Sequence, residues 1–181
     1  MHCLDMYFKK TDLSGVFEIE IELKEDERGY FARIFSDEEL RAAGVPFTIV
    51  QANRSFNAQK GTLRGIHFQK EPFWEAKIML CISGALFVAI VDLRPDSPTY
   101  KKWIGAELSA ENKKELLVPK GCANGFQTLE DSTEVLYLMS ERYSPEHATG
   151  VNYADPQFNI PWPLPVSVIS EKDKQLPHYV G

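Results

Sequence analysis

Three side chains suited to proton transfer lie in segments that otherwise look like β-strands. His67 lies in segment 61–69, where polar residues occupy positions that a core strand would fill with Val or Ile. Lys77 interrupts the apolar segment 75–81, and Tyr137 lies within the apolar segment 134–139. A histidine can act as a base at neutral pH, a lysine as a fixed cation and a tyrosine as a phenolic acid. Together the three could remove a proton and return one.

Each of these residues also has a structural interpretation. His67 could be a barrel histidine with satisfied hydrogen bonds, and Lys77 could be an edge lysine that prevents aggregation. Tyr137 could be a core aromatic whose hydroxyl reaches the rim. A lysine that points inward needs an anion or a carboxylate, because an unpaired buried charge is costly. The other histidines, at the chain ends or in a polar turn, are weaker candidates: His2, His178 and His147.

The segments that must position these residues are mostly short strands. Residues 17–23 alternate apolar and acidic side chains, the period of a strand with one exposed face. Further strands are predicted within 47–56, 61–68, 75–93, 103–109, 115–118 and 122–140, with a hairpin tip at Ser83-Gly84. Short helices are predicted at 36–44, where Ser36 and Glu39 would form a capping box, and at 170–173. Many strands and few helices indicate an all-β antiparallel sandwich or barrel.

Composition excludes several classes of protein. The 181 residues contain 44% hydrophobic and 25% charged side chains, which is typical of one globular domain. A net charge of −6 argues against a nucleic-acid partner. No signal peptide or membrane-spanning segment is apparent, so we expect a cytoplasmic protein with no membrane partner. Its three cysteines lack CxxC spacing and are expected to be reduced thiols: Cys3, Cys81 and Cys122.

The spacing of histidines also tests for a metal site. A metal-binding barrel of the cupin kind needs His-x-His after a glycine turn and a further histidine after a Pro-x-Gly turn. Here the first place reads His67-Phe68-Gln69, and the second, in segment 119–124, ends in Asn124. One histidine is too few for a usual zinc or iron site. The sequence therefore predicts a cupin-like barrel without a metal cofactor.

Several long motifs resemble the dTDP-4-dehydrorhamnose 3,5-epimerase family across nearly the whole chain. They occur in the family's order at residues 26–31, 51–55, 63–69, 91–99, 108–112, 119–121 and 160–163. The resemblance implies one epimerase domain over residues 1–181, with a cupin-type antiparallel jelly-roll barrel at about 16–142 and a few short helices. An extended tail at about 143–181 would follow. It further implies a homodimer without cofactor that acts on 4-keto-6-deoxy nucleotide-diphosphate sugars.

The same resemblance assigns catalytic roles. His67 matches the family's base, Lys77 the cation beside the keto oxygen, and Tyr137 the acid on the far side of the sugar ring. Asp173, in the Ser-x-Lys-Asp segment at 170–173, matches the carboxylate that orients the base. Ser170 and Asp173 also have capping-box spacing, so Asp173 could instead only cap a helical turn.

Substrate-binding positions are implied in the same way. Arg64 and Arg28 match residues near the diphosphate, where a guanidinium suits phosphate oxygens. The alternatives are surface charge for Arg28 and strand pairing for the polar pair Gln51 and Asn53. The complete set of predicted binding residues is Arg64, Arg28, Gln51, Asn53, Asn124, Arg33 and Tyr143.

Some positions depart from the family's pattern. Asn124 stands where the family commonly has histidine, and Arg33 where it usually has glutamate. Arg142 replaces a tyrosine, and Trp74-Glu75 replaces smaller or neutral residues before Lys77. The predicted catalytic set is kept while the recognition set differs. The reaction type is therefore predicted more securely than the nucleotide or the sugar.

Three hypotheses of function follow. The leading one is an epimerase that inverts C3, C5 or both of a 4-keto nucleotide sugar. A 3,4-ketoisomerase of the same superfamily would move the carbonyl through an enediol. A non-catalytic sugar-nucleotide-binding module would keep the pocket alone. For the dimer, the acid-faced strand at 18–22 is a candidate to join the neighbour's sheet, or else a solvated edge.

Overall fold

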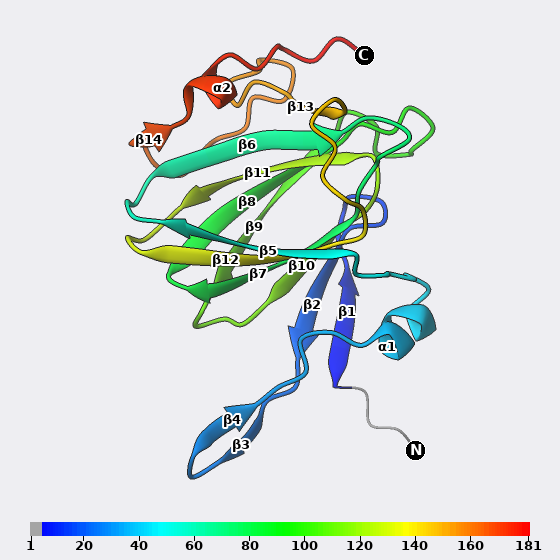
Figure 1. The fold of residues 1–181 in the computed structure, drawn as a ribbon, viewed down its shortest axis with the longest axis vertical. Helices are drawn as coiled ribbons and strands as arrows, with labels where there is room; N and C mark the ends of the chain where they lie inside the picture. The colour runs from blue at the N-terminus through cyan, green and yellow to red at the C-terminus, as the bar shows by residue number, and fades with distance from the viewer. Residues whose placement is uncertain (1–4) are drawn as a thin grey trace.

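Two antiparallel sheets face each other in the computed structural model, which describes residues 5–181 (Figure 1). The predictions for His2 and Cys3 lie outside these residues. The first sheet has the order β1 (Met6–Lys10), β2 (Phe17–Ile21), β10 (Glu115–Val118), β7 (Lys77–Ser83), β12 (Thr133–Met139) and β5 (Gln51–Asn57). The second has the order β13 (Ala148–Gly150), β6 (Thr62–Gln69), β11 (Cys122–Thr128), β8 (Ala85–Asp92) and β9 (Trp103–Ser109), and β14 (Val168–Ile169) pairs with β6. This is the predicted all-β jelly-roll barrel.

The remaining elements are short. A two-stranded hairpin, β3 (Lys24–Asp26) and β4 (Gly29–Phe31), projects from the barrel in Figure 1. The helices are α1 (Asp37–Ala42) and α2 (Glu171–Lys174). No helix of the described residues is long and apolar enough to cross a membrane. The strand β1 and the hairpin were not predicted, and β5 begins at Gln51, later than expected from the pattern at 47–56.

The predicted capping box at α1 is only half correct. Ser36 does cap the helix, because its hydroxyl accepts a hydrogen bond from the Glu39 N–H at 3.3 Å. The Glu39 carboxylate does not turn back to Ser36. It accepts the backbone N–H groups of Asp5 and Met6 at 3.0 and 2.9 Å. Glu39 therefore joins α1 to the start of β1, where two amides would otherwise be buried without an acceptor.

The strand that carries the alternating glutamates is not an edge. β2 pairs antiparallel with β1 on one side and with β10 on the other. Residues 18–22 are therefore not a solvated edge as a whole, because β1 pairs along all of β2 and β10 pairs with residues 17–19. That this segment joins a neighbour's sheet stays a prediction. Glu18 forms an ion pair with Lys114 at 2.8 Å.

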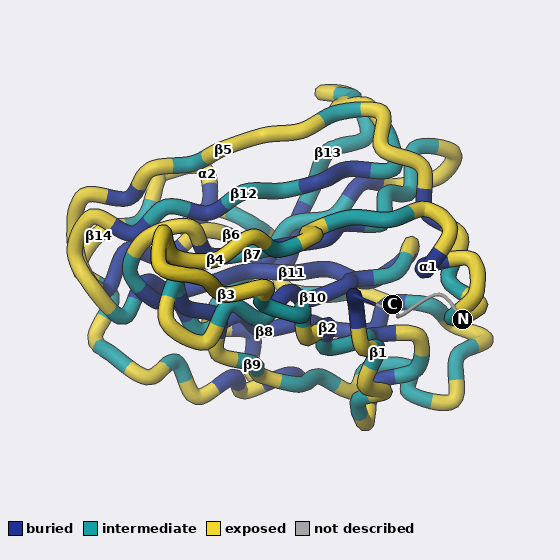
Figure 2. Tube along the Cα trace, turned by 90° about the horizontal axis from the view of Figure 1, so that it is seen from below, coloured by how far each residue is buried: buried dark blue, intermediate teal, exposed yellow. Residues whose placement is uncertain are grey.

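Apolar residues fill the space between the sheets and also cover parts of their outer faces. The central cluster contains residues of β7, β8, β10, β11 and β12, among them Met79, Val88 and Val135. The C-terminal tail packs on β8 and β11 through Phe158 and Ile160. In Figure 2 the central strands β8 and β11 are largely dark, whereas β5 is mostly exposed and the β3–β4 hairpin is exposed throughout.

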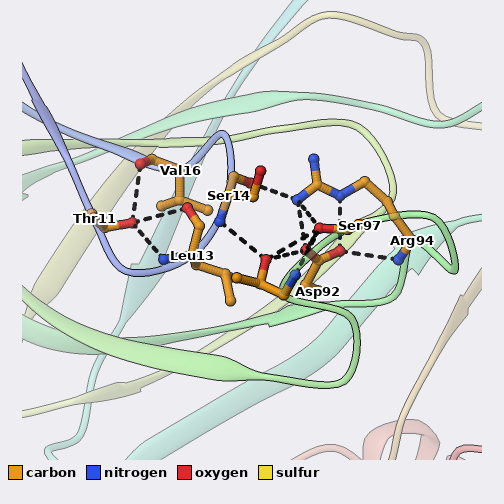
Figure 3. Close-up of polar contacts among 8 residues, drawn as sticks. Thr11, Leu13, Ser14, Val16, Asp92, Arg94 and Ser97 are labelled. Carbon is orange, nitrogen blue, oxygen red and sulfur yellow. Dashed lines mark hydrogen bonds and ion pairs between the residues drawn. The ribbon is translucent and has the colours of Figure 1, made fainter.

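The motif at 91–99 has a structural role away from the cavity described below (Figure 3). The carboxylate of Asp92 is fully buried and accepts hydrogen bonds from Arg94, Ser97 and Thr99. Arg94 also donates to the backbone oxygen of Ser14 in the β1–β2 turn. Burial alone would raise the pKa of Asp92, but these hydrogen bonds lower it to about 2. The network fastens the loop after β8 to the β1–β2 turn.

Glu115 is expected to make the protein less stable as the pH rises. It is fully buried on β10 opposite Ile19 and Leu80, and neither carboxyl oxygen has a hydrogen-bond partner among the described residues. Burial raises the pKa of Glu115 to about 8. The unfolded chain ionises near pH 4.5 and the folded one near 8, so unfolding becomes easier by up to about 1.4 kcal/mol per pH unit between these values.

Replacement of Glu115 tests this dependence. Glu115→Met should raise the melting temperature at pH 8 far more than at pH 5, because the thioether carries no charge to desolvate. The exposed Glu111→Met is the matched control and should shift both values little. A wild-type melting temperature that stays level from pH 5 to pH 8 would contradict the prediction.

Candidate functional site

A cavity of about 440 Å³ lies between the two sheets, and most of the predicted site residues line it. This volume lies within the range of small-molecule sites. β5, β7 and β12 contribute one wall, and β6 and β11 the other. The predicted residues among those that line it are His67, Lys77, Tyr137, Arg64, Gln51, Asn53, Asn124 and Tyr143.

His67 contacts Asp173, as the sequence predicted, although 106 residues separate them in the chain. The distance from His67 Nε2 to Asp173 Oδ1 is 2.7 Å. A carboxylate accepts hydrogen bonds, so Nε2 carries the proton and Nδ1 holds the lone pair. Nδ1 has no hydrogen-bond partner among residues 5–181, which leaves it open to a substrate proton.

Asp173 is held in place from three directions. Its backbone N–H donates to the Ser170 hydroxyl at 3.1 Å at the start of α2, and its Oδ2 accepts the Gly65 N–H at 3.1 Å. Burial would raise the pKa of Asp173, but the hydrogen bonds from His67 and Gly65 lower it below the usual value. The carboxylate therefore stays ionised. Ser170 caps the helix, whereas the Asp173 carboxylate faces His67 and Gly65, so Asp173 does more than cap a helical turn.

A bulge brings Arg64 and His67 to the same wall. Residues three apart on a regular strand point to opposite faces. The register of β6 against β11 runs from His67 opposite Asn124 to Arg64 opposite Phe126, so β6 accommodates one extra residue. Such bulges re-aim side chains beside active sites. Gly65 fits here because its φ is +108° and a Cβ would lie 2.7 Å from the Cα of Gly125.

Lys77 is a buried cation with partners on both walls. Its Nζ lies 2.8 Å from Glu75 Oε1 and donates to Asn124 Oδ1 at 3.0 Å. The side chain is only 11% exposed. Lys77 is therefore not an edge lysine. It points inward, and Glu75 supplies the carboxylate that a buried lysine requires. Its ammonium group can stabilise negative charge that develops in the cavity.

Tyr137 lies on β12, in the sheet opposite to that of His67. Its hydroxyl is 3.0 Å from the Ser55 hydroxyl on the neighbouring strand β5. Burial raises the pKa of Tyr137 to about 12, although the Ser55 hydroxyl and the charge of Arg64 act in the other direction. The phenol is therefore neutral, and able to donate a proton, at any pH at which a cell works.

Polar side chains surround the open part of the cavity. The amide of Gln51 donates to Asn53 Oδ1 at 2.9 Å, and both residues are on β5. Arg64 Nε donates to Asn57 Oδ1 at 2.7 Å, which leaves the end of the guanidinium largely free. Tyr143 is 56% exposed. This rim offers hydrogen bonds, a cation and an aromatic ring to a ligand.

Two predicted binding residues do not line the cavity of their own chain. Arg28 lies on the β3–β4 hairpin, is 83% exposed and pairs with Asp26. Arg33 forms ion pairs with Asp5 and Glu39 at 2.6 and 2.9 Å. Within one chain the structure therefore separates both arginines from the other predicted residues.

Eleven residues that line the cavity were not among the predicted site residues, and three polar ones among them bear on its chemistry: Ser55, Glu75 and Lys172. Ser55 continues the period of two from Gln51 and Asn53, so strand alternation could have identified it. Lys172 directly precedes Asp173 in the chain. Glu75 was noted only as a departure from a family pattern. The part of the chain that the structure describes contains no group of three or more His, Cys, Asp or Glu side chains that could hold a metal ion.

Comparisons by sequence and by structure find similarity to the same family of proteins. The family model described as dTDP-4-dehydrorhamnose 3,5-epimerase matches residues 10–180. A dTDP-4-dehydrorhamnose 3,5-epimerase of Sinorhizobium fredii is 44% identical over 174 residues, which cover 96% of this chain and 89% of that protein.

Two solved structures are similar over almost their whole length. One is a dTDP-4-dehydrorhamnose 3,5-epimerase from Bacillus anthracis with TDP and PPi bound, at 42% identity and a TM-score of 0.93, covering 96% of this chain and 99% of that one. The other is an epimerase from Legionella pneumophila in complex with dTDP-4-keto-L-rhamnose, at 35% identity and a TM-score of 0.90, covering 96% and 92%.

Proposed function

Because this chain belongs to the dTDP-4-dehydrorhamnose 3,5-epimerase family, we propose that it inverts C3, C5 or both of a 4-keto nucleotide-diphosphate sugar with the residues of this cavity. The observation that carries the assignment of residues is their placement on two facing walls. His67 comes from one sheet, and Tyr137 and Lys77 come from the other, where Lys77 reaches across to Asn124 in the sheet of His67. A base and an acid on opposite sides of a ring are what inversion requires.

His67 would act as the base. A proton on a carbon next to the 4-keto group moves to Nδ1, and its bonding electron pair becomes the double bond of an enolate, with the negative charge on O4. Asp173 keeps the other nitrogen protonated and stabilises the imidazolium that forms. Proton transfer by a positioned base is worth on the order of 10²–10⁴-fold in rate.

Lys77 would stabilise the enolate, and Tyr137 would return the proton. An ammonium group beside O4 should contribute about 3–4 kcal/mol, by analogy with oxyanion-hole donors. The neutral phenol of Tyr137 then protonates the same carbon from the opposite face, which inverts the centre. The imidazolium loses its proton to water and the phenolate gains one, so each turnover places a solvent hydrogen on the inverted carbon.

The nucleotide would lie at the polar rim. Arg64 and Lys172 line the cavity and would bind the diphosphate. Arg64 can offer paired N–H groups to phosphate oxygens. Gln51, Asn53 and Tyr143 would contact the rest of the substrate. Asn124 accepts a hydrogen bond from Lys77. Because Lys77 would contact the keto group, Asn124 would lie near the sugar of the substrate.

A homodimer is proposed for the working enzyme. The β3–β4 hairpin is exposed along its whole length, and Tyr30 and Phe31 on it are 56% and 69% exposed. In the proposed dimer a second copy covers this hairpin and buries these two aromatic side chains. Sedimentation of the protein tests the proposal, since the mass of a single chain would exclude it.

The state of the cysteines supports a cytoplasmic location for the enzyme. Cys81 and Cys122 are free and buried, and burial raises their pKa values to about 11 and about 12. Unpaired thiols of this kind are usual in the reducing cytoplasm, which is where we place the enzyme.

Deuterium exchange tests the function. The protein is incubated in D₂O with several 4-keto nucleotide sugars, and deuterium at C3 and C5 is counted by mass spectrometry or NMR. An epimerase incorporates deuterium and leaves the ketone at C4, whereas a ketoisomerase moves the ketone. A binding module incorporates none. Absence of deuterium with every sugar would therefore remove the proposed function.

A further inference from the structure

Glu75 is a buried carboxylate of the cavity that the reaction described above does not use. It lies just before β7 and its side chain is 9% exposed. Its Oε1 is 2.8 Å from Lys77 Nζ, and its Oε2 accepts a hydrogen bond from Gln69 Nε2 at 3.0 Å. Both carboxylate oxygens therefore face a donor, and neither is directed at a free part of the pocket.

The ammonium group of Lys77 has three protons and two protein partners. One partner is Glu75 Oε1 and the other is Asn124 Oδ1, at 3.0 Å. The amide nitrogen of Asn124 faces Met79 Sδ at 3.5 Å, so its oxygen is the atom turned toward Lys77. Two fixed acceptors leave one N–H for a third partner. Because the group lines the cavity, that partner is a ligand atom or water.

The orientation of Gln69 means that a glutamine at position 75 could not accept hydrogen bonds from both Gln69 and Lys77. Its Oε1 accepts the Ser144 N–H at 2.6 Å, and its Nε2 also donates to the backbone oxygens of Phe73 and Arg142 at 3.0 and 3.1 Å. These bonds fix the orientation of Gln69, whose two N–H protons are shared among Phe73 O, Arg142 O and Glu75 Oε2. A glutamine at 75 would have to direct its own NH₂ group either at Gln69 Nε2 or at Lys77 Nζ, where no acceptor exists.

We propose that Glu75 is a positioning residue for Lys77: with Asn124 it fixes the ammonium group so that the third N–H meets the carbonyl oxygen of the substrate. The inference rests on the proposed function, in which Lys77 stabilises the enolate. The carboxylate offsets the cost of burying the cation, and its second oxygen, held by Gln69, fixes the direction of the first. Glu75 itself does not touch the reacting atoms.

The test compares Glu75→Gln with the matched control Glu71→Gln, which changes an exposed glutamate of the preceding loop. Steady-state deuterium exchange is measured with a dTDP-4-keto-6-deoxyhexose, together with dTDP affinity and melting temperature. Because misplacing a catalytic group by about 1 Å can cost on the order of 10²-fold, Glu75→Gln should lower kcat about 10- to 100-fold. KM and dTDP affinity should change less than about threefold.

Three outcomes decide the inference. If wild type and Glu71→Gln exchange deuterium and Glu75→Gln keeps their kcat, or exceeds it, Glu75 does not position Lys77. If kcat falls only in proportion to the fraction of protein that binds dTDP, Glu75 is merely structural and the inference also fails. Should Glu75→Gln not fold, Glu75→Asp replaces it: a shorter carboxylate cannot reach both donors, so kcat must fall while dTDP binds fully, and an unchanged kcat overturns the inference. Absence of exchange in wild type removes the proposed function and this inference with it.

Discussion

His67→Asn is expected to lower the rate of deuterium exchange at C3 and C5 by orders of magnitude and to leave dTDP affinity within about twofold of wild type. The imidazole is placed to take a carbon-bound proton at neutral pH, because Asp173 lies 2.7 Å from Nε2 and keeps it protonated, which leaves Nδ1 free. Asparagine keeps a polar side chain but has no basic nitrogen. The loss should be on the order of 10²–10⁴-fold in exchange rate.

Mass spectrometry of the sugar after incubation in D₂O, and dTDP titration, measure the two quantities. His178→Asn is the matched control, because His178 is exposed near the chain end and does not line the cavity. Exchange at the wild-type rate in His67→Asn would show that the base is another residue. A loss of dTDP binding equal to the loss of exchange would show that His67 only maintains the pocket.

Tyr137→Phe is expected to separate exchange from inversion. Without the phenol, His67 can still remove a proton, exchange it with solvent and return deuterium to the same face. The recovered sugar should therefore carry deuterium with its original configuration. Formation of the inverted product should fall on the order of 10²–10⁴-fold, because Tyr137 is the acid on the opposite wall.

NMR of the recovered sugar reads both the deuterium and the configuration. Tyr7→Phe, at a half-exposed tyrosine of β1, is the control and should invert at the wild-type rate. Inverted product formed by Tyr137→Phe at the wild-type rate would assign the acid to another group. A complete loss of exchange would instead mean that Tyr137 also takes part in removing the proton.

Local patterns were sufficient for most of the barrel. The alternation at 17–23 gave β2, and the apolar runs on either side of Ser83-Gly84 gave β7 and β8, with Gly84 at a φ of +73°. Patterns could not show that β2 is paired on both sides, because pairing of distant strands depends on the whole sheet. Likewise, the Glu39 carboxylate reaches Asp5 and Met6, which no local capping rule includes.

The site depended more on the family resemblance than on spacing. Strict alternation would have separated Arg64 from His67, and only the bulge in β6 brings them together. Asp173 meets His67 across 106 residues, a contact that spacing alone does not give. Glu75 was noted only as a departure from the family pattern, because its burial and its contact with Lys77 are visible only once the strands are placed.

A crystal structure of the enzyme with a dTDP-4-keto-6-deoxyhexose in the cavity tests the proposed mechanism most directly. We expect the sugar ring to lie between the two sheets with its C4 oxygen in hydrogen-bond contact with Lys77 Nζ. His67 Nδ1 and the Tyr137 hydroxyl should approach opposite faces of the ring. A sugar bound outside this cavity, or one with both groups on the same face, would contradict the proposed mechanism.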